Sequence, residues 1–67
     1  MIEVTINGQN RKIRKGLSVT ELLLDLGLKD SILLAEINGE MVHKDRFPEE
    51  RVEEGDILEL IRITGGG

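Results

Sequence analysis

The chain has 67 residues, no cysteine and a formal net charge of -4 at pH 7. A domain of this size buries only about 60% of the surface that its unfolded chain exposes, so we do not expect a self-contained enzyme with a deep cavity. The lack of cysteine excludes disulfides, a thiolate zinc site and a cysteine nucleophile on this chain. No apolar run approaches the length of a membrane span and no signal segment is recognisable, so we expect a soluble cytoplasmic protein without membrane contact.

The negative charge is concentrated in the second half of the chain. Residues 31–67 carry nine Asp and Glu against four Lys and Arg, whereas residues 1–30 carry four against five. Such an acidic surface repels a phosphate backbone and is complementary to a basic groove on a protein. We therefore expect no nucleic acid partner, although the same charges are also typical of an ordinary solvated face.

Residues 1–15 predict a β-hairpin. Ile2, Val4 and Ile6 alternate with polar residues, and Asn7-Gly8 is a pair favoured in two-residue type I′ turns. Apolar residues on alternate positions point to one face of a strand. The hairpin is therefore expected to bury one face and to leave the other in solvent.

A helix is predicted to follow the hairpin. Ser18 and Glu21 have the spacing of a capping box, in which each side chain accepts a hydrogen bond from the other residue's backbone. Gly27 is suited to end the helix in the left-handed conformation, after about three turns. One apolar stripe would face a sheet, and it consists of Val19, Leu22, Leu23 and Leu26.

The remaining elements are predicted to be strands. Residues 32–37 form a strand-length apolar run, and Asn38-Gly39 repeats the hairpin signal before a short strand at 40–42. Residues 54–56 predict a turn into a last strand. This order predicts an α+β fold of the β-grasp (ubiquitin-like) type, with a mixed sheet of four to five strands and one main helix packed on one face.

The last strand has two faces of different character. Leu58 and Leu60 share one face, and the other carries Ile57, Glu59, Ile61 and Ile63. Glu59 predicts that the second face is in solvent, where these four residues would form a partner contact. Burial of both faces of a central strand is the alternative.

The chain ends in Gly65, Gly66 and Gly67. We predict a domain at residues 1–64 and a tail at 65–67. Glycine accepts any backbone conformation, so this tail could thread a narrow channel and carry its carboxylate to the catalytic groups of another protein. That carboxylate has an ordinary pKa of about 3.3 to 3.7 and is a possible nucleophile toward an activated phosphate. Taken alone, a terminal glycine triplet is more often a frayed end or an expression remnant.

Together these segments resemble the ubiquitin-like sulfur carriers, most closely the ThiS family of thiamine biosynthesis. The resemblance covers nearly the whole chain, and the length favours this family over the usually longer small subunit of molybdopterin synthase. It is carried by residues 2–8, 17–23, 35–42, 54–56 and 66–67.

The resemblance implies a co-substrate with no catalytic residue, no metal and no bound cofactor. An E1-like (ThiF-like) enzyme would use ATP and Mg to adenylate the carboxylate of Gly67. Sulfur from a persulfide donor, supplied by a cysteine desulfurase, would displace AMP and leave a thiocarboxylate. A thiazole synthase (ThiG-like) would consume that sulfur. Gly66 and Gly65 would thread the channel of the partner.

Several alternatives remain open from the sequence. The same chemistry could serve molybdopterin synthesis, tRNA thiolation or cysteine synthesis. In a different class, the chain would be a non-covalent β-grasp binding module with an inert tail. His43 is the sole histidine and, like the glutamates at 49–50 and 53–54, is expected to be an ordinary surface residue.

Overall fold

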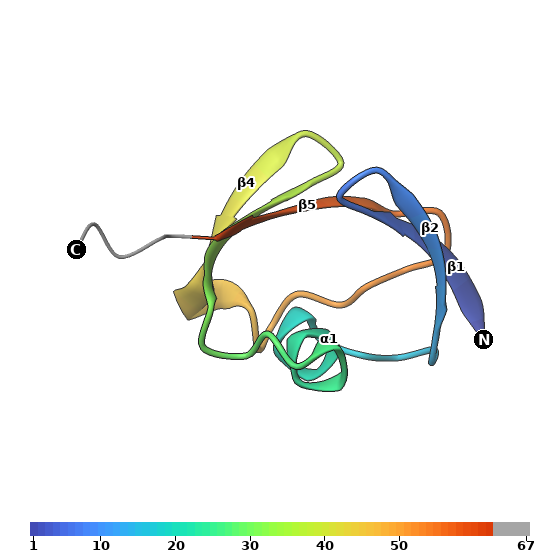
Figure 1. Cartoon of the computed structure of the whole chain (residues 1–67), viewed down its shortest axis with the longest axis horizontal. Helices are drawn as coiled ribbons and strands as arrows, with labels where there is room; N and C mark the ends of the chain where they lie inside the picture. Colours follow the sequence, from blue (N-terminus) through green and yellow to red (C-terminus); the bar gives the residue numbers. More distant parts are fainter. Residues whose placement is uncertain (63–67) are drawn as a thin grey trace.

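The computed structural model describes residues 1–62, so the predictions made for Ile63, Gly65, Gly66 and Gly67 lie outside the described residues (Figure 1). Five strands form one mixed sheet in the order β2-β1-β5-β3-β4. Strands β1 and β5 are parallel, and the other neighbours are antiparallel. The elements in chain order are β1 (Ile2–Ile6), β2 (Gln9–Ile13), α1 (Val19–Leu26), β3 (Ile32–Ile37), β4 (Glu40–His43), the 3-10 helix η1 (Lys44–Arg46) and β5 (Ile57–Arg62). The predicted β-grasp arrangement is confirmed, with β1 and β5 side by side.

Both hairpin turns have the predicted geometry. Asn7 and Asn38 adopt φ values of 50° and 53°, and the glycine after each also has a positive φ. A type I′ turn needs positive φ at both central positions, which asparagine and glycine tolerate best. The two Asn-Gly pairs therefore set the register of the β1–β2 and β3–β4 hairpins.

The helix α1 begins at the predicted capping box. The backbone N–H of Glu21 donates to Ser18 Oγ at 3.1 Å, and the backbone N–H of Ser18 donates to Glu21 Oε1 at 2.8 Å. Gly27 ends the helix in the left-handed conformation, at φ 74°. With eight residues, α1 makes just over two turns rather than the predicted three, because both capping residues leave the helical conformation.

The core lies between α1 and one face of the sheet (Figure 1). Its fully buried side chains include Leu22 and Leu23 of α1 and Leu58 of β5. Phe47 and Val52 are also buried, although they belong to the charged, irregular segment between β4 and β5. No helix described within residues 1–62 is long and apolar enough to cross a membrane.

Candidate functional site

Strand β5 leads from the core of the sheet toward the C-terminal glycines. On one side it pairs with β1, where Thr5 lies opposite Ile57 and Ile6 opposite Leu58. On the other side it pairs with β3 from Leu58 as far as Arg62. Within the described residues, the part of β5 nearest the tail is therefore hydrogen-bonded as a strand on the β3 side.

Two asparagine side chains, one from each hairpin turn, hold β5 by hydrogen bonds to its backbone. Asn7 Oδ1 accepts a hydrogen bond from the backbone N–H of Leu60 at 2.7 Å, just beyond the end of β1. Asn38 Oδ1 accepts from the backbone N–H of Ile57 at 2.9 Å, and Asn38 Nδ2 donates to Asp56 Oδ1 at 2.9 Å. The side chains of the two hairpin turns thus hold β5 at its start and beyond its midpoint.

The two faces of β5 differ as predicted from alternation. Leu58 is fully buried and Leu60 is 7% exposed, on the face toward α1. Ile57 and Ile61 are 54% and 36% exposed, and Glu59 between them is exposed as well. Burial of both faces is thereby excluded for residues 57–61. We call the face of the sheet that points away from α1 the outer face.

Strands β3 and β4 add residues to the outer face that the sequence did not single out. Leu34 lies opposite Ile61, and Glu36 lies opposite Glu59. On β4, Met41 lies opposite Glu36 and is 56% exposed. Simple alternation from the buried Ile32 would place Leu34 and Glu36 on the core side. A register shift between Ile32 and Leu34 reverses that alternation, so the inward residue is Ala35.

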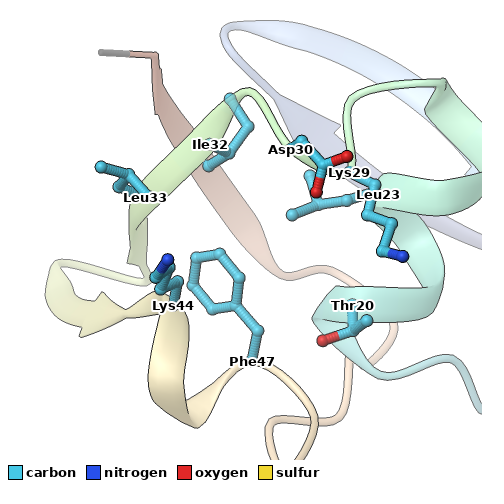
Figure 2. A pocket seen from close by; sticks show the side chains of 8 residues that line it. All are labelled: Thr20, Leu23, Lys29, Asp30, Ile32, Leu33, Lys44 and Phe47. Carbon is cyan, nitrogen blue, oxygen red and sulfur yellow. The ribbon is translucent and has the colours of Figure 1, made fainter.

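The hollow drawn in Figure 2 lies on the helix side of the sheet. Its volume is about 190 Å³, and buried Leu23, Ile32 and Phe47 are among its lining residues, with Lys44 beside the Phe47 ring. Pockets for small molecules usually measure about 300 to 1,000 Å³. This hollow is therefore smaller than a typical ligand site.

His43 and the Arg46–Glu49 pair are surface groups. His43 Nδ1 accepts a hydrogen bond from the backbone N–H of Asp45 at 3.3 Å, and the His43 side chain is 55% exposed. Glu49 pairs with Arg46 at 3.2 Å, also on the surface. Among residues 1–62, no group of three or more His, Cys, Asp or Glu side chains could hold a metal ion. The surface assignment of His43 is confirmed.

The chain is similar in sequence to members of one known family. The model of the ThiS family matches residues 4–67. The sulfur carrier protein ThiS of Bacillus subtilis (strain 168) is 30% identical over 63 residues, which are 92% of this chain and 96% of that protein. A thiazole synthase of Paramagnetospirillum magneticum is 33% identical over 66 residues, which are 98% of this chain. The chain spans only 20% of that thiazole synthase.

Solved structures agree with the fold. The crystal structure of the thiamine biosynthesis protein ThiS from Geobacter metallireducens superposes with a TM-score of 0.82 at 32% identity, covering 98% of this chain and all of that one. A solution NMR structure of a thiamine biosynthesis protein from the same organism gives a TM-score of 0.78 and covers 98% of this chain and 88% of that one.

Proposed function

This chain belongs to the ThiS family, whose members are sulfur carriers of thiamine biosynthesis and not catalysts, and we propose that it carries its sulfur on the carboxyl group of Gly67. The observation that supports this proposal is the extent of the family match, which continues through residue 67 and so includes the glycine tail. In the sequence, Ile63 and Thr64 separate the tail from β5, the strand that the two hairpin asparagines hold in place. A fixed strand followed by glycines suits a carrier that presents its C-terminus to a partner.

The chemistry follows from the weakness of a carboxylate as an acyl donor. Attack of the Gly67 carboxylate on the α-phosphate of Mg-ATP, bound by the adenylating partner, would form an acyl-adenylate and release pyrophosphate. Sulfide attacking the acyl carbon would then release AMP and leave the thiocarboxylate. With a persulfide donor the first product is an acyl disulfide, and a second thiol must reduce its S–S bond. Because ATP is the activating substrate, the proposed reaction belongs in the cytoplasm.

Gly66 and Gly65 serve the same proposal through their lack of side chains. A channel that admits the terminal carboxylate and excludes water has little room beside the backbone. A larger side chain at Gly66 would obstruct that channel without altering the folded domain. These two residues are therefore proposed as the threading segment of the carrier.

A thiazole synthase is the proposed acceptor of the sulfur. One relative of this chain is itself a thiazole synthase and contains a stretch similar to nearly all of this domain within a chain about five times as long. A carrier domain joined to its acceptor in one protein supports a physical association of the two in proteins where they are separate. The E1-like adenylating enzyme and the desulfurase-derived sulfur donor are proposed on the chemistry alone.

The outer face of β5, the last strand before the tail in the sequence, is the proposed docking surface for these partners. Ile57, Glu59 and Ile61 present exposed side chains on β5, and Ile63 continues the same alternation in the sequence. Exposed apolar side chains that gather beside a reactive group favour an interface.

The first experiment is an intact-mass measurement. The chain is incubated with Mg-ATP, the adenylating enzyme of the same organism and a sulfide donor. We expect a mass change equal to one oxygen replaced by one sulfur, located at Gly67 by fragmentation. A chain without Gly66 and Gly67 is expected to remain unchanged.

A second truncation sharpens the test. Removing Gly67 alone leaves a chain that still ends in two glycines but is shorter by about 3.3 Å. Loss of modification in this variant would indicate that the reach of the tail matters as well as its composition. No mass change in the intact chain, with an enzyme that adenylates another carrier, would contradict the proposal and support a non-covalent binding module.

A further inference from the structure

Two glutamates face each other at the centre of the outer face. Glu36 on β3 lies directly opposite Glu59 on β5. We propose that this pair binds an arginine or lysine side chain of the adenylating partner and thereby identifies this carrier to that enzyme. The inference rests on the proposed function, because it concerns the partner that acts on Gly67.

The strand register places like charges directly opposite each other in the free protein. Directly opposite residues of an antiparallel pair have Cβ atoms about 4.5 to 5.5 Å apart, and like charges at that separation destabilise the sheet. Within residues 1–62, neither carboxylate takes part in an ion pair, since the three that form join Arg14 to Asp25, His43 to Asp45 and Arg46 to Glu49. The repulsion between Glu36 and Glu59 is therefore not relieved by a neighbouring cation of the described chain.

Another cross-strand pair, on β1 and β2, is arranged in the opposite way. Glu3 on β1 lies directly opposite Lys12 on β2, so here the sheet places unlike charges together. Glu3 belongs to the exposed positions of β1, which alternate with the buried Ile2 and Val4. The like-charged pair is thus a feature of the β3–β5 part of the sheet.

Apolar side chains surround the two carboxylates. Ile57 and Ile61 flank Glu59 at two residues on either side, and both are exposed. Leu34 and Met41 border Glu36 from β3 and β4. A partner covering this surface would remove water from around the carboxylates, and charge interactions strengthen as water is excluded. A guanidinium can bridge two carboxylates with its five N–H donors, so the site fits arginine best.

The tail itself offers little by which a partner could recognise it. Gly65, Gly66 and Gly67 have no side chains, so selection among glycine-ended proteins must use the folded surface. Glu36 and Glu59 lie on the outer face of β3 and β5, and β5 is the last strand before the tail in the sequence. A second copy of this chain is a poor occupant, because a two-fold interface on this face would bring four carboxylates together.

The test compares steady-state adenylation of three variants. Carrier concentration is varied in assays of pyrophosphate release with Glu36→Gln/Glu59→Gln, with Glu3→Gln and with the unaltered chain. We expect the double variant to raise KM about tenfold, as for loss of a charge pair worth about 1.4 kcal/mol, with kcat unchanged. Glu3→Gln removes a charge of the same sign from the outer face on β1, outside the β3–β5 pair, and should change KM by less than about twofold.

Two further readouts separate docking from a structural effect. Added salt should raise KM for the unaltered chain and for Glu3→Gln, and much less for the double variant. Thermal unfolding should show the double variant to be more stable than the unaltered chain by about 2 to 4 °C, because the repulsion is gone. If the pair had only a structural role, its neutralisation would not weaken binding to the enzyme and raise thermal stability at the same time.

A direct binding measurement tests this inference separately from the proposed function. Calorimetry without ATP measures the affinity of the adenylating enzyme for each unmodified chain. If the unaltered chain binds but is never adenylated, the proposed function fails, and the loss of affinity in the double variant still supports the inference. The inference is overturned if the unaltered chain does not bind, or if the double variant binds as tightly as Glu3→Gln.

Discussion

The start of α1 depends on two side chains, Ser18 and Glu21. Each accepts a hydrogen bond from the other's backbone N–H, which satisfies two donors that a helix N-terminus otherwise leaves without partners. The hydrogen bond from the Ser18 backbone lowers the pKa of Glu21 below its ordinary value of 4.5, and the positive charges of Arg51 and Arg14 act in the same direction. The charged carboxylate is thus favoured in the folded state.

This shift predicts a pH-dependent effect of Glu21→Gln. Glutamine can still cap the helix, so the variant isolates the charge. Because the folded-state pKa is lowered, the charge stabilises the protein above the ordinary value of 4.5, and this contribution is lost as the pH falls through the folded-state pKa. Urea unfolding in steps from about pH 7 to about pH 2 should show a stability difference that shrinks with falling pH. A difference that stays constant would contradict the assignment.

At the scale of elements, β5 owes its position to the turns of its neighbours. The Asn-Gly pairs first close the β1–β2 and β3–β4 hairpins, and their asparagine side chains then accept hydrogen bonds from the β5 backbone at Leu60 and Ile57. Strand β1 pairs with β5 as far as Leu58, and Asn7 continues the contact by two hydrogen bonds. Its backbone N–H donates to the Leu58 carbonyl oxygen at 2.9 Å, and its side chain accepts from the Leu60 N–H. The Asn7 side chain therefore supplies one of the two hydrogen bonds by which this residue couples the turn to β5.

The variant Asn7→Gly is predicted to separate the contribution of the turn conformation from that of the side-chain hydrogen bond. Glycine keeps the positive φ of the turn but removes the acceptor for the Leu60 N–H, so the free energy of unfolding should fall by about 1 kcal/mol. Hydrogen exchange at the Leu60 amide should become faster. Asn7→Asp is the matched control, because aspartate retains the oxygen acceptor and tolerates the same conformation. Equal exchange rates at Leu60 in the two variants would contradict this explanation.

At the scale of the whole molecule, the two faces of the sheet have different roles: the inner face stabilises the fold, and the outer face is the one proposed to bind partners. One face of β5 packs on α1 through Leu58, whereas the other presents Ile57 to solvent. A chain of 67 residues is expected to have a free energy of unfolding of only about 3 to 10 kcal/mol. A defect on the inner face should therefore remove a large part of this stability, whereas one on the outer face should leave it nearly unchanged.

Leu58→Ala and Ile57→Ala test this separation on adjacent residues. Leu58→Ala leaves a cavity in the core and should lower the free energy of unfolding by about 2 to 5 kcal/mol. Ile57→Ala should change it by no more than about 0.5 kcal/mol, while weakening binding to the adenylating enzyme. Chemical unfolding measures the first quantity and calorimetry the second. A strongly destabilised Ile57→Ala variant would indicate that the outer face is part of the core.

The sequence by itself determined the features that rest on local patterns. The sequence patterns behind these features are the two Asn-Gly turns, the capping box of α1, the stop at Gly27 and the alternation along β5, and each lies within a stretch of at most seven residues. The order of the elements then left few ways to cover one face of a sheet with a single helix. Local chemistry and element order were therefore sufficient to predict the β-grasp fold.

Only the tertiary structure decided which distant residues meet. The register shift after Ile32 turns Leu34 and Glu36 to the outer face, and it reflects the fit of the whole sheet to the core rather than any local signal. Glu36 and Glu59 are 23 positions apart in sequence, so their pairing follows from strand register alone. Phe47 reaches the core from a segment without periodicity, because burial there depends on the space left between α1 and β3.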